Sequence, residues 1–180
     1  MLEDKILVWR LNRGQKNVLR DIYEKYKHEL VTLSAALLNN KEAAEDMVHD
    51  VFLRLINSNG NLKIKTNLKG YLMTAVANTA RNKNKSAGVR QTVEISDELI
   101  QDEQSSNPEA SAIFGDDKKH LISALNQLPY EQKEVILLRI YSRLTFKAIA
   151  QTLNESINTV QGRYRYGLDK LRSIYNGAQK

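Results

Sequence analysis

Arginine, tyrosine and amide side chains gather in one stretch near the C-terminus, LTFKAIAQTLNESINTVQGRYRYGLDKLR, residues 144–172. If residues 157–175 form a helix, apolar residues occupy one narrow arc and polar residues the rest. The polar surface carries Asn158, Thr159, Gly162, Arg163 and Tyr166, with Gln161 and Arg165 on its flanks. Amide, hydroxyl, guanidinium and phenol groups can hydrogen-bond base edges or phosphates, and a helix fits the major groove of DNA. This surface is therefore a candidate for reading DNA.

A helix expected over residues 145–153 must hold this surface in place. Its apolar face consists of Leu144, Ala148, Ile149 and Leu153, and the 157–175 helix would bury Ile157, Val160, Tyr164, Leu168 and Leu171. Asn154 can adopt the left-handed conformation that ends a helix, and Ser156 can cap the next helix. The pattern predicts a helix-turn-helix. A helical hairpin with a purely structural role is the alternative.

Two glycines lie within the expected recognition helix. Gly162 and Gly167 each cost about 1 kcal/mol relative to alanine in a helix interior. Their presence indicates a close approach to the backbone, either by nucleic acid or by a packed neighbour, and the sequence leaves both explanations open.

The charge of the chain is unevenly distributed. Residues 1–86 hold 15 Lys and Arg against 9 Asp and Glu, residues 87–117 hold 1 against 8, and residues 118–180 hold 11 against 4. Two basic blocks therefore flank an acidic strip. Separate basic surfaces favour two contacts with a polyanion, because neutralising phosphates is the usual use of concentrated Lys and Arg. Ordinary solvated helix faces are the alternative.

The chain is expected to be all-α. It has only two prolines, Pro108 and Pro129, and its apolar residues recur at spacings of three and four. Helices are predicted at residues 2–12, 17–38, 41–57, 67–86, 115–127, 131–142, 145–153 and 157–175. The acidic stretch AGVRQTVEISDELIQDEQSSNPEA lacks this periodicity. We therefore predict two small helical domains, 1–86 and 115–180, joined by a flexible acidic linker over residues 87–114.

Several classes of protein are disfavoured by the composition. The 180 residues include no cysteine, which excludes disulfides and thiolate metal sites. His28, His49 and His120 are scattered, and no hydrolytic or phosphate-cradling motif occurs, so we expect neither a metal, nor a cofactor, nor an enzyme. No run of about 18 apolar residues exists, so membrane insertion is not expected and the cytoplasm is the expected location.

Two N-terminal helices present surfaces of different character. The core stripe expected for the 41–57 helix consists of Ala44, Met47, Val48, Val51 and Leu55. The opposite face is expected to be exposed and consists of Asp46, His49, Asp50 and Leu53. An apolar leucine among acids favours a protein contact over a merely solvated face, although the second reading stays open. The 67–86 helix points Leu68, Leu72, Ala75, Val76 and Thr79 inward and ends in a polar tail of Asn78, Arg81, Asn82, Lys83, Asn84 and Lys85. Such a tail suits a nucleic-acid backbone and unstacked bases.

These motifs resemble the sigma factors of bacterial RNA polymerase. The runs LPYEQKEVILLR, LTFKAIA and TVQGR follow the order and spacing of sigma region 4. The runs KEAAEDMVHDVFLRLI and NLKGYLMTAVANTARNKNKS resemble region 2 over most of residues 10–86. Only the acidic linker lies between the two, so the chain is identified as a member of the two-domain, extracytoplasmic-function (ECF) type of the sigma-70 family.

The resemblance implies a role for each surface. Region 4 would bind the −35 promoter element, with Arg143, Thr145 and Lys147 on the phosphate backbone and Asn158, Thr159, Gln161, Gly162, Arg163, Arg165 and Tyr166 on the recognition surface. Region 2 would open the −10 element, through the loop at 57–67 and through Tyr71, Asn78, Arg81, Asn82, Lys83 and Lys85. The β′ coiled coil of core polymerase would contact Asp46, His49, Asp50, Phe52 and Leu53. An anti-sigma factor is a further expected partner.

Some positions depart from the family pattern, and one rival function remains. In region 4, many relatives have Lys or Arg at the position of Gln161, Ser or Asn at that of Gly162, and Arg at that of Tyr166. In region 2, Tyr71 replaces a common Trp and Ser86 replaces a common Asp. The promoter sequence therefore cannot be copied from a relative. The rival is a helix-turn-helix repressor or activator that binds a palindromic site as a dimer.

Overall fold

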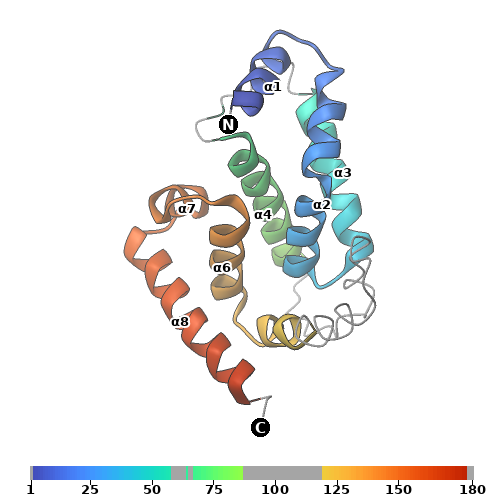
Figure 1. Ribbon diagram of the computed structural model, residues 1–180. Helices are drawn as coiled ribbons and strands as arrows, with labels where there is room; N and C mark the ends of the chain where they lie inside the picture. Colours follow the sequence, from blue (N-terminus) through green and yellow to red (C-terminus); the bar gives the residue numbers. More distant parts are fainter. Residues whose placement is uncertain (1, 58–63, 65–66, 87–118, 178–180) are drawn as a thin grey trace.

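The computed structural model describes residues 2–57, 64, 67–86 and 119–177. Helices α1 (Leu2–Asn12), α2 (Val18–Leu38), α3 (Lys41–Asn57) and α4 (Leu68–Ser86) form the N-terminal group. Helices α6 (Tyr130–Ser142), α7 (Phe146–Leu153) and α8 (Ile157–Gly177) form the C-terminal group, preceded by a helical stretch at 119–126. Figure 1 shows the C-terminal group lying beside α4. The predicted all-α fold is confirmed.

The helix boundaries follow the predicted ones closely. The start of α6 at Tyr130 directly follows Pro129, whose extended backbone (φ −54°, ψ 141°) marks the entry to the helix. Helix α8 runs two residues beyond the predicted end. The predicted acidic linker at 87–114, residues 115–118 of the helix predicted at 115–127, and most of the loop at 57–67 lie outside the described residues.

The core of the N-terminal group contains the stripe predicted for α3. Its five residues, Ala44, Met47, Val48, Val51 and Leu55, are all buried. Phe52 is also buried, with 5% of its surface exposed, and its ring meets that of Tyr23 edge-on at 4.9 Å between centroids. The expectation that Phe52 contacts polymerase is therefore corrected: the residue packs against α2 and is not part of the exposed face.

Left-handed residues end three of the helices. Asn39, Arg143 and Asn154 have φ values of 54°, 55° and 54° and follow α2, α6 and α7. The backbone N–H of Asn154 donates to the carbonyl oxygen of Ala150 and so satisfies one of the free carbonyls at the end of α7. The prediction for Asn154 is confirmed.

Helix α4 is buried on two faces, whereas the sequence pattern predicted a single buried face. The expected inward residues pack against α2 and α3, but Gly70, Met73, Ala77 and Ala80 are buried as well. The additional burial arises because α6 packs against both α4 and α2. The two groups of helices consequently share one continuous hydrophobic core.

Candidate nucleic-acid and protein interfaces

Helices α7 and α8 form the predicted helix-turn-helix. The side-chain oxygen of Ser156 accepts a hydrogen bond from the N–H of Thr159 at 3.0 Å, which confirms the predicted cap of α8. Thr145 caps α7 in the same way, accepting from the N–H of Ala148 at 3.2 Å. Ile149 of α7 and Val160 of α8 are fully buried and anchor the pair.

Aromatic and guanidinium contacts fix α7 and α8 against the rest of region 130–177. The rings of Phe146 and Tyr164 meet edge-on, with their centroids 5.2 Å apart. The Arg139 guanidinium lies 5.0 Å from the Phe146 ring centroid and donates to the carbonyl oxygen of Leu144. The turn and both helices are therefore held by one connected set of contacts.

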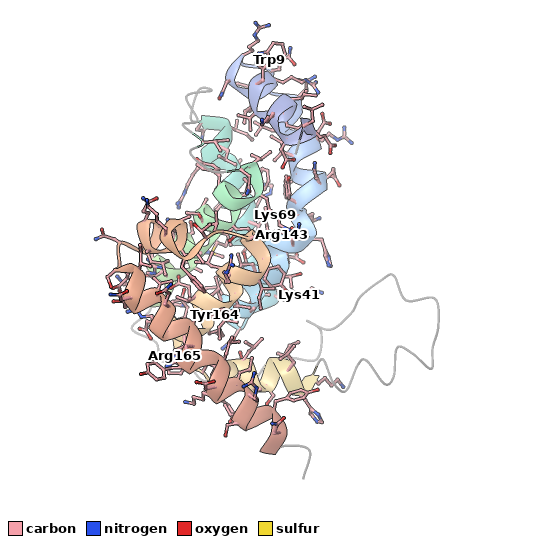
Figure 2. The ribbon with its side chains drawn as sticks, turned by 60° about the vertical axis from the view of Figure 1, so that its left-hand side comes forward. Trp9, Lys41, Lys69, Arg143, Tyr164 and Arg165 are labelled. Carbon is pink, nitrogen blue, oxygen red and sulfur yellow. The ribbon has the colours of Figure 1, made fainter. Side chains whose placement is uncertain are left out.

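The outer face of α8 presents the predicted recognition residues. Asn158, Gln161, Arg165 and Tyr166 are exposed, and Thr159, Gly162 and Arg163 are half-buried. Arg165 donates to the Tyr166 hydroxyl at 3.2 Å and its guanidinium lies 4.9 Å from the ring centroid of Tyr166. Arg143, Thr145 and Lys147 are exposed around the start of α7; Arg143 and Arg165 are labelled in Figure 2.

Two predictions about α8 change with the structure. Ile157 was expected in the buried stripe but is 42% exposed, because it opens the helix, where the packing against α7 has not yet begun. Arg163 is not free to reach DNA in this conformation: it forms an ion pair with Glu155 at 2.9 Å. The exposed Arg165 instead contacts Tyr166 of the same helix.

The two glycines of α8 have different explanations. A Cβ at Gly167 would lie 2.8 Å from Ile136 Cδ1 and 3.1 Å from Gln132 Cβ, so this glycine lets α8 approach α6. A Cβ at Gly162 would meet only the Tyr166 ring, at 4.0 Å. Packing therefore accounts for Gly167, while Gly162 leaves an open place on the recognition surface.

The predicted −10 residues lie on α4, partly beneath α6. Arg81 forms an ion pair with Glu134 of α6 at 2.8 Å. Asn82 and Lys85 are exposed, and Tyr71, Asn78 and Lys83 are half-buried. Burial raises the pKa of the Tyr71 hydroxyl, so this residue stays neutral at physiological pH. Only part of this surface is open in the structure.

The predicted protein-binding face of α3 is open. Asp46, His49, Asp50 and Leu53 are all exposed, and Leu53 shows 44% of its surface among the acids. Ile56, one turn beyond Phe52, adds a second exposed apolar side chain to the end of the same helix. Ile56 lies outside the face predicted from the sequence.

Two buried charges were missed from the sequence. Lys133 and Glu134 of α6 show 4% and 2% of their surface. The Lys133 ammonium donates to the side-chain oxygens of Asn39 at 3.0 Å and Asn126 at 3.4 Å. Because Lys133 and Glu134 directly precede the apolar run at 135–138, the sequence indicated that at least one of the two would face the interior. It could not indicate their partners, since Asn39 and Arg81 are remote in sequence.

Burial shifts the pKa of both groups. It raises the pKa of the Glu134 carboxyl, and the Arg81 guanidinium opposes that change. It lowers the pKa of the Lys133 ammonium to about 8, because removing the charge from water disfavours the protonated form. Both charges lie at a cavity of about 770 Å³ lined by α2, α4 and the C-terminal helices.

Among the described residues, no three histidine or acidic side chains come together in a way that would hold a metal ion. None of the described helices is long and apolar enough to cross a membrane.

The comparisons with known proteins identify both groups of helices. Residues 22–88 match Sigma-70 region 2, and residues 124–173 match Sigma-70, region 4. The chain therefore belongs to the sigma-70 family. Within that family it is an extracytoplasmic-function sigma factor, and the resemblance found in the sequence is confirmed.

Similar proteins cover nearly the whole chain. RNA polymerase sigma factor CarQ of Myxococcus xanthus is 26% identical over 168 residues, which span 92% of this chain and 93% of CarQ. The ECF RNA polymerase sigma factor SigX of Bacillus subtilis is 24% identical and spans 84% of this chain and 80% of its own.

Two solved structures share the fold. CnrH, in complex with the cytosolic domain of CnrY, aligns over 97% of each chain with a TM-score of 0.68 and 16% identity. The sigma factor RpoE of Bartonella quintana, in complex with the anti-sigma factor NepR, aligns over 87% of this chain and 98% of its own, with a TM-score of 0.62 and 21% identity.

Proposed function

We propose that this chain is a dissociable specificity subunit that binds core RNA polymerase in the cytoplasm and directs it to promoters. The observation that carries the proposal is the presence of both sigma regions in one chain, each with a polar surface exposed. The chain performs no bond chemistry itself; it positions the polymerase.

The helix-turn-helix would anchor at the −35 element. Helix α8 would enter the major groove, with Gln161, Arg165 and Tyr166 facing base edges. The exposed Arg143 and Lys147, with the Thr145 hydroxyl, would hold the phosphate backbone and set the register of the helix. The support is the exposure of these groups on α8 and around the start of α7.

The N-terminal helices would dock on polymerase and open the −10 element. The acidic face of α3, which ends in the exposed Leu53, would contact the β′ coiled coil. Tyr71 and the polar end of α4, including Arg81 and Lys85, would hold the separated strand through stacking and charge. Linking both DNA contacts through one polymerase raises their effective concentration, so two weak contacts select one promoter.

An anti-sigma factor is the further partner that we propose. Both solved neighbours are complexes of a sigma factor, one with the cytosolic domain of CnrY and one with the anti-sigma factor NepR. The dimeric regulator considered as an alternative is not favoured, since residues 22–88 match region 2 rather than a dimerisation or sensor module.

Gel filtration of the purified chain with sigma-free core polymerase tests this function. We expect the two to co-elute, and the mixture to start transcripts at defined promoters that sequencing identifies. A chain with Asp46, Asp50 and Leu53 all replaced by alanine is the matched control and should elute alone. Failure of the unmodified chain to bind several bacterial cores, while it binds palindromic duplex DNA as a dimer, would instead favour the alternative.

A further inference from the structure

The N-terminal helix α1 carries a row of apolar side chains that faces away from the protein. Leu2, Ile6 and Trp9 are 76%, 50% and 52% exposed, and their spacings of four and three residues place them on one side of the helix. The opposite side buries Leu7 and Leu11 in the hydrophobic core. The helix is therefore apolar on both sides, although only one of them is buried.

Polar contacts with α2 decide which side of α1 is turned outward. The Asp4 carboxylate accepts hydrogen bonds from the Tyr26 hydroxyl at 2.7 Å and from the Lys25 ammonium at 2.9 Å. Lys25 also pairs with Glu3 at 2.7 Å. Because Tyr26 is buried and its hydroxyl needs a partner, rotating α1 about its axis would cost this hydrogen bond. The outward position of the apolar row is therefore a defined feature of the fold.

An arginine covers the Trp9 ring. The backbone N–H of Arg13 donates to the Trp9 carbonyl oxygen at 3.2 Å, which continues the helical turn, and the guanidinium lies 4.0 Å from the centroid of the indole ring. This cation–π contact restrains the ring. About half of the Trp9 surface nevertheless stays exposed. The pair thus combines an accessible aromatic ring with a positive charge.

The charges around this ring favour an anionic partner. Lys5, one turn before Trp9 on the same side of the helix, is an exposed cation, as is Arg13. The two acids of α1 are by contrast engaged by Lys25 of α2. An aromatic ring between cations fits a partner that has flat apolar faces and negative charges at once.

Single-stranded DNA has both properties. Its unpaired bases expose aromatic faces that a duplex hides, and proteins bind it by stacking these bases on aromatic side chains beside Lys and Arg. Arginine adds cation–π attraction to such a stack. A lipid surface fits less well, since inserting the Trp9 ring would also desolvate the Arg13 guanidinium that lies on it.

The helix beside α1 is the one to which the proposed function assigns the separated strand. Helix α1 packs against α4, and Tyr71 lies in the first turn of α4. Figure 1 shows α1 at the end of the N-terminal group where α4 begins, and Figure 2 labels Trp9 at the same end of the molecule. A strand held on α4 can therefore continue onto α1.

We propose that Trp9 is a stacking site for an unpaired base of the promoter strand that region 2 separates, and that Arg13 and Lys5 hold the adjacent phosphates. This inference rests on the proposed function, because only a chain that opens DNA meets such a strand. It extends the single-strand surface from α4 to α1 and adds a contact that opposes re-pairing of the strands.

The chain has a single tryptophan, so its own fluorescence reports on this contact. The full-length chain is titrated at low salt with a mixed-sequence single strand of about 12 nucleotides, with the same sequence as a duplex, and with phosphatidylglycerol vesicles. Stacking should quench the emission with the single strand and leave it unchanged with the duplex. Absence of quenching by the single strand overturns the inference, and a shift to shorter wavelength with the vesicles would then identify a lipid surface instead.

Two substitutions separate stacking from apolar docking. Trp9→Leu keeps an apolar side chain and removes the ring, so affinity for a labelled single strand should fall about tenfold. Ile6→Ala removes apolar surface and leaves the ring, so it should have a much smaller effect. Trp9→Phe keeps a smaller ring and should lie between the unmodified chain and Trp9→Leu. An effect of Ile6→Ala as large as that of Trp9→Leu would overturn stacking in favour of an apolar docking face.

Arg13→Gln tests the cation, since it should weaken single-strand binding and reduce the dependence of that binding on salt. Lys27→Gln is the matched control: the Lys27 ammonium also lies over a ring, 5.4 Å from the centroid of Tyr23, but that ring packs against the buried Phe52. Lys27→Gln should leave the affinity unaltered. Equal effects of the two substitutions would show that only overall charge matters and would refute the stacked pair.

A measurement on the holoenzyme separates this inference from the proposed function. Trp9→Leu should still co-elute with core polymerase and direct it to the same promoters, but its open complexes should dissociate about tenfold faster than those of the unmodified chain. Equal lifetimes would remove Trp9 from the single-strand surface. If neither the unmodified chain nor the variant binds core polymerase, the proposed function itself fails, whatever the oligonucleotide titrations show.

Discussion

Gly167 of α8 faces Ile136 of α6 so closely that an added Cβ would lie 2.8 Å from the isoleucine Cδ1. This approach sets how the recognition helix sits on its support. The other glycine of the helix, Gly162, has open space above it on the outer face. Substitutions at the two glycines therefore distinguish two effects on stability: the packing of α8 on α6, and the conformational cost of a glycine within a helix.

Gly167→Val should lower the free energy of unfolding by about 1–3 kcal/mol, since the extra methyl groups overpack the α6–α8 contact. Gly162→Ala should raise it by up to about 1 kcal/mol, because alanine favours the helix and meets no close neighbour. Urea denaturation of the full-length chain measures both. Equal effects of the two substitutions would contradict the packing assigned to Gly167.

Ser156→Ala should destabilise the helix-turn-helix by about 1 kcal/mol, because the N–H of Thr159 loses its acceptor. Ser173→Ala, at an exposed site near the end of α8, should change stability little. Thermal unfolding followed by circular dichroism compares the two variants. The cap assignment fails if Ser156→Ala is as stable as Ser173→Ala.

Arg165→Ala should weaken use of the specific promoter by about 1–3 kcal/mol of binding free energy, without loss of polymerase binding. The reason is that Arg165 stands on the exposed face of α8, stacked on Tyr166. Arg172→Ala, two turns further along the same helix, is the control. Transcription and promoter affinity at fixed salt are the measurements, and unchanged values for Arg165→Ala would remove this residue from the recognition surface.

Asp50→Ala should have the opposite pattern. We expect affinity for core polymerase to fall about tenfold, equivalent to about 1.4 kcal/mol, while binding of duplex DNA by the free chain is retained. Glu24→Ala removes an exposed acid from α2 and should leave polymerase affinity unaltered. A titration of labelled chain with core polymerase distinguishes the two, and equal affinities would exclude Asp50 from the contact.

The burial of Lys133 makes the stability of the chain depend on pH. Its pKa is lowered to about 8 by burial, so between about pH 8 and its ordinary pKa near 10.5 the unfolded chain binds more protons. Stability therefore rises with pH in that window, by up to about 3 kcal/mol, as the cost of burying the charge disappears. Denaturation between pH 7 and 9.5 should show this rise in the unmodified chain and a smaller one in Lys133→Met. Parallel pH profiles would show that Lys133 is solvated.

Local patterns in the sequence predicted most helices and several contacts that hold the helix-turn-helix. The α3 stripe, the Asn154 turn and the Ser156 cap depend on residues a few positions apart, which helical geometry relates directly. The second buried side of α4 could not be found in this way. Its burial depends on α6, some fifty residues further along the chain, and no periodicity within α4 specifies that partner.

The same limit explains the individual errors. Phe52 lies next to the predicted stripe on the α3 surface, and the position of Tyr23 decides that its ring turns inward. Ile157 has the right spacing for the core but stands before the first packed turn of α8. Arg81 and Arg163 were correctly placed on polar surfaces, yet their partners, Glu134 and Glu155, come from other elements.

The recognition face of α8 also bears on how such proteins diverge. Val160 and Gly167 anchor the helix from within, whereas Gln161, Arg165 and Tyr166 contribute nothing to the core. Exposed substitutions of that kind usually change stability by less than about 0.5 kcal/mol. After gene duplication, a copy can therefore acquire a new set of target genes through a few surface changes, without first acquiring a more stable scaffold.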